Sequence, residues 1–411
     1  MTATWVILAA CALLVAWLVA VAGVVLGLRR RTAQAWQSPV VRRPMLVLES
    51  DDWGAGPPAQ ARALKEIASV LRRHRDGTGR APVMSLALVL AVPDGAAVAA
   101  GQGYRRIELD APPLRPVLDA LREGVAAGVL GVQLHGHEHF WPPALMRCVE
   151  SDVQAWLQRP EPAVTEQLPS HLQSRWVDAS RLPSSPLPAG QVRAAVAQEV
   201  AAYRRIVGEV PAVVVPPTFV WTREVEQAWA QAGVEFVVTP GWRSTLRDAS
   251  GRPEGDEGPI VNGERAGRLT YLVRTDYFEP ARGRDAAHAL AALDRAAAQG
   301  QPCVLENHRD NFIFDEAQCR RSLAELDALC AGAVRRQPAV RFLSTVELGR
   351  ILRERDPEWV VTAWRERLPF VWERVRHSGR PWRLLRLLGA AAPGELLVRL
   401  IGVRAAEAPR S

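Results

Sequence analysis

Between residues 44 and 352 the spacing of apolar positions alternates between that of buried strands and that of amphipathic helices. The strand-type runs are PMLVLES, APVMSLALVL, VLGVQLHG, PAVVVPP, EFVVTPG, LTYLVRT, QPCVLENH and VRFLS. Apolar residues that recur every three or four positions predict helices over residues 59–73, 113–127, 144–158, 190–207, 284–299 and 316–334. This alternation predicts an α/β fold with parallel strands and covering helices, and the number of strands favours a (β/α) barrel.

The N-terminal segment is apolar enough to cross a membrane. Its first 28 residues carry no charged side chain and run into Arg29, Arg30 and Arg31, whereas a span needs roughly 20 residues. We expect a single-pass transmembrane anchor with a basic flank over residues 1–31, a linker over 32–43 and the barrel over 44–352. A cleaved signal peptide is the alternative, but no basic residue precedes the apolar run.

The C-terminal tail, residues 353–411, is rich in Arg and Trp with amphipathic spacing. Such helices either lie on an anionic membrane surface or pack on the barrel or on another subunit. From Val361 to Ser411 there are ten arginines against four glutamates, so most of the net charge of +7 belongs to the tail. The body is near neutral and shows no nucleic-acid motif, so we expect no nucleic-acid partner.

The polar residues that follow the strand-type runs are the main chemical signal. Asp51 and Asp52 follow the first run, the motif HGHEH a later one, PPTFVW a third and His308 a fourth. In a barrel of parallel strands, the carboxyl ends of the strands meet on one face. We therefore expect these side chains to converge. None of the five cysteines forms a CxxC pair, which argues against a cysteine metal site or a disulfide framework.

Three histidines within five residues indicate a metal site. His135 and His139, together with the carboxylate of Asp52, would supply three ligands and leave a position open for water, as catalytic metal sites do. A divalent cation would also offset the repulsion between the adjacent aspartates. Asp51 is then the general base for an attacking water, and His308 is the general acid.

These motifs resemble the polysaccharide deacetylase (NodB-homology) family, in an atypical branch with an HGxEH segment. SDDWG resembles the Asp-Asp motif, HGHEH the two-histidine motif, VPPTFVW the groove wall and LENH the segment with the catalytic histidine. The resemblance implies a distorted seven-stranded (β/α) barrel. It also implies hydrolysis of the amide C–N bond of N-acetylated sugars in a polysaccharide or glycan precursor, with O-acetyl esters as the alternative. The implied cofactor is a divalent metal, commonly zinc, with cobalt or manganese as alternatives.

Two departures from the family pattern bear on the substrate. The third motif lacks the arginine that holds the base aspartate, and Arg274 after LTYLVRT is the candidate substitute. Trp53 stands where glycine is usual and is expected to reshape the mouth of the site. We place Trp53 and Arg274 with the residues expected to contact an acetylated carbohydrate, which also include Pro217, Phe219 and Trp221.

Two other functions fit parts of the sequence. His135, Glu138 and His139 match the HxxEH signature of a metallopeptidase, which needs a helix that Gly136 and the following prolines disfavour. A non-catalytic glycan-binding barrel would explain the missing third-motif arginine. The arginine flank of the anchor favours a cytoplasmic active site, whereas the family resemblance favours the outer face, so the side of the membrane stays open.

Overall fold

The structure, a computed structural model, describes residues 2–162, 164–255 and 258–402. It contains two compact units, which we call the helical unit and the barrel unit. The helical unit comprises Met1–Arg42, Ala297–Gln301 and Arg355–Ser411. The barrel unit comprises Arg43–Ala296 and Pro302–Glu354.

The barrel unit is built on one ten-stranded sheet, in the order β12-β13-β9-β8-β5-β2-β1-β15-β14 with β16 paired to β1. Every pairing in it is parallel except the β12–β13 hairpin. The strands are β1 (Met45–Gly54), β2 (Met84–Val89), β5 (Leu130–Leu134), β8 (Val213–Val214), β9 (Phe236–Thr239), β12 (Arg265–Ala266), β13 (Leu269–Val273), β14 (Asp276–Tyr277), β15 (Cys303–His308) and β16 (Arg341–Phe342).

The sheet curls round on itself. β13 and β14 stand near opposite ends of the strand order, yet only Arg274 and Thr275 separate them in the chain. This is the curled α/β sheet that the alternation of strand and helix spacing predicts. The carboxyl ends of the parallel strands consequently meet on one face.

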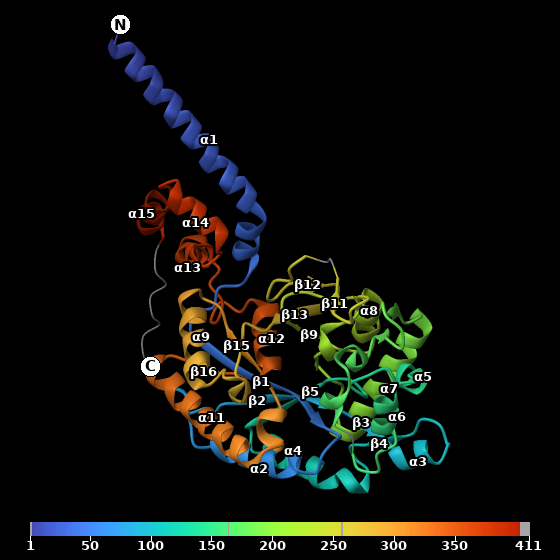
Figure 1. Cartoon of the computed structure of the whole chain (residues 1–411). Helices are drawn as coiled ribbons and strands as arrows, with labels where there is room; N and C mark the ends of the chain where they lie inside the picture. Colours follow the sequence, from blue (N-terminus) through green and yellow to red (C-terminus); the bar gives the residue numbers. More distant parts are fainter. Residues whose placement is uncertain (1, 163, 256–257, 403–411) are drawn as a thin grey trace. The chain divides into compact units, whose positions relative to one another are not determined.

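Helices surround this sheet (Figure 1). The larger ones are α2 (Gln60–Leu71), α4 (Arg115–Ala126), α7 (Ala189–Val207), α8 (Arg223–Gln231), α9 (Ala286–Ala298), α11 (Glu316–Arg336) and α12 (Thr345–Glu354). In α2 the buried residues Leu64, Ile67 and Leu71 recur every three or four positions, which is the pattern that predicts a helix over 59–73. α4, α7, α9 and α11 likewise match the expected ranges. α8 and α12 were not predicted.

One expected helix is divided. The range 144–158 holds α5 (Pro142–Arg147) and α6 (Ser151–Leu157), because Cys148 and Glu150 have extended backbones that end one helix and precede the next. Short elements complete the unit: α3 (Gly95–Ala99), α10 (Asp310–Ile313), the hairpins β3–β4 (Ala91–Pro93 and Arg106–Glu108) and β10–β11 (Leu246–Arg247 and Pro253–Glu254), and the 3-10 turns η1 (Pro112–Leu114), η4 (Pro217–Phe219) and η5 (Pro280–Arg282).

Residues 160–190 form a long excursion that is rich in Pro and Ser. Among its described residues no long helix or strand occurs before α7 begins at Ala189. The excursion forms the 3-10 turns η2 (Thr165–Gln167) and η3 (Ser170–Gln173) and the hairpin β6–β7 (Val177–Asp178 and Ser185–Pro186). Side chains nevertheless tie it down, as Arg247 donates to Ser174 Oγ at 2.9 Å and to Ser170 O at 2.9 Å. The excursion is therefore a fixed part of the barrel unit.

The helical unit contains α1 (Thr2–Gln37), α13 (Trp364–Arg376), α14 (Arg380–Leu387) and α15 (Ala391–Ile401). Within α1, Thr4–Gly27 is long and apolar enough to cross a membrane, a test that a signal sequence passes equally. Arg374 is buried and donates to five backbone carbonyls, those of Ala35, Ser38, Pro39, Gln299 and Gly300. The amphipathic tail helices are present, and the expected tail beyond residue 402, like Met1, lies outside the described residues.

Candidate metal centre

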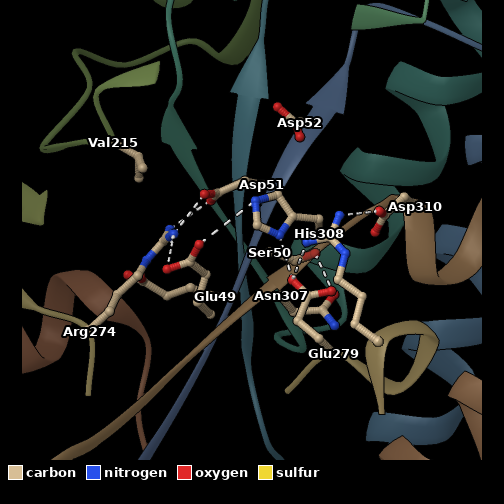
Figure 2. Close-up of polar contacts among 12 residues, drawn as sticks. Glu49, Ser50, Asp51, Asp52, Val215, Arg274, Glu279, Asn307, His308 and Asp310 are labelled. Atoms are coloured by element: carbon tan, nitrogen blue, oxygen red, sulfur yellow. Dashed lines mark hydrogen bonds and ion pairs between the residues drawn. The ribbon is translucent and has the colours of Figure 1, made fainter. Parts of the chain in front are cut away.

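The two adjacent aspartates occupy the carboxyl end of β1, where the strand is irregular. The pairing of β1 with β2 shifts register between Ser50 and Trp53, and Asp52 has a left-handed backbone with φ of 71°. This irregularity gives the neighbouring side chains different partners. Figure 2 shows Asp51 joined to Arg274, while Asp52 lies apart from that pair. Both aspartates are buried.

Asp52 faces the two histidines that the sequence singles out. Its Oδ1 lies 3.4 Å from His135 Nε2 and 3.2 Å from His139 Nε2. The Nδ1 of His135 donates to Val215 O at 2.8 Å, which fixes the ring with Nε2 facing Asp52. Asp52, His135 and His139 therefore bring three potential ligand atoms within 4.8 Å of one another.

The donor set fits a divalent cation. Asp52 Oδ1 is buried and has no hydrogen-bond partner among the described residues, although a buried carboxylate oxygen normally has one. Burial lowers the pKa of His139 to about 4, so its imidazole is in the neutral form that binds metals. One carboxylate and two imidazoles are ligands that zinc commonly uses. A cation would thus satisfy groups that the protein alone leaves unsatisfied.

Arg274 holds Asp51 in a buried ionic network. Its Nη1 and Nη2 each donate to one oxygen of Asp51 at 2.7 Å, and its Nε donates to Glu49 Oε2 at 2.6 Å. Burial alone would raise the pKa of Asp51, but the charges of Arg274 and of nearby histidines outweigh burial and lower it. Asp51 is therefore ionised at neutral pH. The third motif contains no arginine, and Arg274, which directly follows β13, makes the contact with Asp51 for which the sequence suggests it as a substitute.

His308 is oriented by a second carboxylate. Its Nδ1 donates to Glu279 Oε1 at 2.5 Å, and Asn311 Nδ2 donates to Glu279 Oε2 at 2.6 Å. Burial by itself lowers the pKa of His308, but the bond to Glu279 and the charges of Asp52 and Asp51 outweigh it and raise the pKa to about 10. The imidazole is consequently protonated at neutral pH and able to give up a proton from Nε2.

Glu306 lies two residues before His308 on β15, so both side chains point to the same side of the strand. Glu306 Oε2 is 3.4 Å from Arg274 Nη1, and Oε1 is 3.8 Å from His308 Nε2. Asp51, Glu306 and His308 form a second group of possible ligands. Both oxygens of Asp51 already accept from Arg274, so the group around Asp52 is the better cation site.

These side chains open into one cavity of about 310 Å³. The residues that line it come from β1, the HGHEH loop, the 160–190 excursion, η4, η5 and β15: Asp51, Asp52, His135, His139, Glu166, Gln173, Pro216, Thr218, Phe219, Arg282, Glu306 and His308. All five residues expected to do chemistry are among them. Sequence segments more than 250 residues apart therefore meet at one face of the sheet.

The structure corrects three of the expected substrate contacts. Trp53 is fully buried and donates from Nε1 to Ser50 Oγ at 2.8 Å, while Trp221 is fully buried and donates to Glu226 at 2.7 Å. Pro217 is also buried and does not line the cavity. Phe219 does line it, and its ring lies under the Arg274 guanidinium at 5.4 Å. Arg274 supports Asp51 from behind and is not a lining residue.

The remaining polar residues of the HGHEH loop point away from the cavity. Glu138 is fully buried, and its Oε2 accepts from Arg175 Nη1 at 2.7 Å. His137 Nε2 is 3.1 Å from Glu108 Oε1. The loop is not helical, so Glu138 cannot act as the base that an HxxEH peptidase needs. Its role is to anchor the loop that carries His135 and His139.

Sequence reasoning missed six residues at this site. Glu306 and Glu279 have a signal in retrospect, because both lie near strand ends. Glu306 shares β15 with His308, and Glu279 lies two residues beyond the end of β14, which pairs with β15. Glu166 and Gln173 have none, because they lie in a segment without periodicity. Arg282 and Thr218 are lining residues that pattern analysis also left out.

Comparison with known proteins found similarity in solved structures. No protein-family model and no curated protein matched the sequence. A putative polysaccharide deacetylase from Mycobacterium smegmatis shares 13% identity, with 77% of this chain and 94% of that chain covered and a TM-score of 0.42. A family 4 carbohydrate esterase from Streptomyces lividans, in complex with acetate, shares 14% identity, with 72% and 90% covered and a TM-score of 0.31.

A family 4 pseudoenzyme from Bacillus anthracis also matches, at 10% identity and a TM-score of 0.35, with 75% of this chain and 66% of that chain covered. The TM-scores are below 0.5, so the assignment of function rests on the residues of the site.

Proposed function

We propose that this chain is a metal-dependent hydrolase that removes acetyl groups from N-acetylated sugars by cleaving the amide C–N bond, with O-acetyl esters as the alternative substrate. One observation carries the proposal. The ligand set Asp52, His135 and His139 shares a cavity with Asp51 and His308, and each of the last two is held by its own charged partner.

Asp52, His135 and His139 would hold the cation, with zinc favoured by the donor set and cobalt or manganese as alternatives. When bound, a divalent cation in such a site polarises the acyl carbonyl and lowers the pKa of a water towards about 7. The protein's own contribution is to aim both imidazoles at the position of the cation, and the bond from His135 Nδ1 to Val215 O fixes one of the two rings.

Asp51 acts as the general base. It accepts a proton from the attacking water while the water oxygen forms a bond to the acyl carbon. Arg274 occupies both carboxylate oxygens from behind, so the carboxylate is ionised and cannot turn away. The proton therefore has one fixed acceptor.

His308 acts as the general acid. The C–N bond breaks as Nε2 of His308 delivers its proton to the departing nitrogen, giving an amine and acetate. Its bond to Glu279 keeps the imidazole protonated and directs Nε2 into the cavity. A positioned acid of this kind typically contributes about 10²- to 10⁴-fold in rate.

The test is acetate release from N-acetylated oligosaccharides by the purified chain, measured beside its metal content. We expect about one zinc-like ion per chain and acetate release that a chelator abolishes and zinc restores. A chain that holds no metal after supply of zinc, cobalt and manganese would refute the proposal. Metal binding without acetate release would favour the glycan-binding alternative.

We also propose that α1 holds the protein at the cell membrane, with α13 to α15 contributing lipid contacts. The support is the exposed apolar surface of Thr4–Gly27 and the exposed leucines of α14 and α15. Sedimentation with membranes after an alkaline wash tests the anchor, and release into the supernatant would refute it. A reporter enzyme fused after Ser411 would establish the side of the membrane.

A further inference from the structure

The 160–190 excursion contributes one wall of the cavity, through residues that belong to none of the sequence motifs. Glu166 comes from η2 and Gln173 from η3, and both line the cavity together with the proposed metal ligands and catalytic groups. Neither residue has a part in the chemistry proposed above. Their position nevertheless gives them contact with any molecule that enters.

This wall is fixed to the catalytic strand end. Arg309 directly follows His308, and its Nε and Nη2 donate to the two oxygens of Glu166 at 2.8 Å each. Arg309 is 1% exposed and Glu166 is half-buried, so this is a partly buried, bidentate ion pair, which has well-defined geometry. The excursion therefore cannot swing aside without breaking a charge pair.

A second set of bonds fixes the wall to the loop that carries Phe219. Ser174 Oγ is hydrogen-bonded to Thr218 Oγ1 at 2.7 Å, and Gln173 Nε2 donates to Leu168 O at 2.7 Å. Gln173 thus keeps its amide oxygen for a ligand while its amide nitrogen braces the turn. Thr218, the hydroxyl partner, itself lines the cavity.

The cavity is small and is lined almost entirely by buried and half-buried residues. Of the twelve lining residues only Arg282 is exposed, and the others are buried or half-buried. The volume of about 310 Å³ is at the lower end of the range, about 300–1,000 Å³, of small-ligand pockets. An internal unit of a polymer needs a groove open at two ends, because the chain must leave in both directions. A small cavity with a largely buried lining suits one sugar unit with its acyl group.

The chemistry of the lining matches such a unit. The two carboxylates of Glu166 and Glu306, the amide of Gln173 and the hydroxyl of Thr218 offer hydrogen bonds to sugar hydroxyls, and the Phe219 ring offers an apolar face on which a sugar ring can stack. We propose that the enzyme deacetylates a single terminal sugar unit, and that the wall formed by Glu166 and Gln173 sets this restriction. The inference rests on the proposed function.

The first experiment uses the full-length, zinc-loaded chain with N-acetylglucosamine oligomers of one to six units, and mass spectrometry locates each lost acetyl group. We expect every oligomer to lose one acetyl group, from an end unit, and then to stop. Loss of acetyl groups from internal units would overturn the inference.

The second experiment separates the wall from the chemistry. Gln173→Ala removes a lining side chain and leaves the Arg309–Glu166 pair intact, and Gln167→Ala, in the same excursion but outside the cavity, is its matched control. We expect Gln173→Ala to raise KM for the single sugar about tenfold, the effect of one hydrogen bond. Gln167→Ala is expected to keep the KM of the unsubstituted chain for the single sugar and its rate with 4-nitrophenyl acetate.

The two failures are distinguishable. A zinc-loaded chain that hydrolyses neither 4-nitrophenyl acetate nor any oligomer would refute the proposed function. A chain that hydrolyses the ester and deacetylates internal units would refute only the restriction to a terminal unit. An unchanged KM in Gln173→Ala would remove the wall from the explanation.

Discussion

Two buried arginines show how differently the two units use charge. In the barrel unit, Arg274 is bonded to the carboxylates of Asp51 and Glu49, whereas in the helical unit Arg374 is bonded only to backbone carbonyls. Burial lowers the pKa of Arg374 to about 10, while the carboxylates around Arg274 outweigh burial and raise its pKa. A buried cation among carboxylates orients groups that exchange protons. A buried cation among carbonyls joins backbone segments and does no chemistry.

The two units also differ in the kind of side chain that they expose. Most of the large apolar side chains that are exposed belong to the helical unit, among them Leu387 at 82%, Leu400 at 74% and Leu13 at 72% exposure. The barrel unit places its apolar residues inside and turns polar groups into a cavity. The barrel unit therefore gathers polar groups around a cavity, whereas the helical unit exposes apolar side chains, as the proposed membrane contact requires.

The largest expected effect comes from removing a metal ligand of the barrel unit. Asp52→Ala should abolish metal binding and lower kcat/KM at least about 10³-fold, because the cation supplies several kcal/mol of stabilisation to the transition state. His137→Gln is the control, since His137 belongs to the same motif cluster but contacts Glu108 instead of the cavity. Metal content and acetate release are measured for both variants. Equal losses would mean that the motif acts only through folding.

The two arginines give the next test. Arg274→Met should lower kcat about 10²-fold or more and cost about 3–5 kcal/mol of unfolding free energy, because it leaves buried carboxylates unpaired. Arg374→Met should lower stability by a few kcal/mol without changing kcat of the folded protein. Denaturant unfolding and single-turnover kinetics separate the effects. A fall in kcat for Arg374→Met would break the contrast between the units.

A change of pH tests the pairing of His308 with Glu279. The pKa of His308 is raised in the folded protein from 6.5 to about 10. Its protonated form therefore stabilises the fold below the unfolded pKa, and that contribution is lost as pH rises through about 10. Glu279→Gln removes the carboxylate, so the alkaline limb of kcat should move to lower pH. A profile with an unchanged limb would show that another group is the acid.

The smallest expected effect concerns the exposed leucines of the helical unit. Leu387→Glu places a charge on α14 and should reduce the fraction recovered with anionic vesicles by about twofold or less, since α1 remains. Phe314→Glu is the matched change in the barrel unit, where Phe314 is 53% exposed. Equal reductions in both variants would remove the distinction between the two surfaces.

The parts of the site that could be predicted lie at the ends of periodic strands. Asp51, Asp52, His135 and His308 follow an apolar run or end it, His139 lies four residues beyond His135 in the same loop, and strand ends converge in a barrel. Arg274 was foreseen as a substitute because it too ends a strand. The burial of Trp53 and Trp221 was not foreseen, because the partners that bury them, Phe312 and Glu226, come from separate elements.

Other features have no local signal at all. The pairing of Glu166 with Arg309 joins residues 143 positions apart, one of them in a segment without helical or strand spacing. The division of the expected helix over 144–158 depends on the extended backbones of Cys148 and Glu150, residue types that do not forbid a helix. Tertiary contacts decide both, and a single sequence does not contain them in local form.

The left-handed backbone of Asp52 has a consequence for directed evolution. A residue other than glycine at φ of 71° stores strain, typically of order 1 kcal/mol or more. Glycine at this position would relieve that strain, so Asp52→Gly should be more stable than Asp52→Ala by about 1 kcal/mol. Selection for thermal stability alone would therefore favour loss of the carboxylate that the centre needs. Screens of this protein must score hydrolysis together with stability, because at residue 52 the two are opposed.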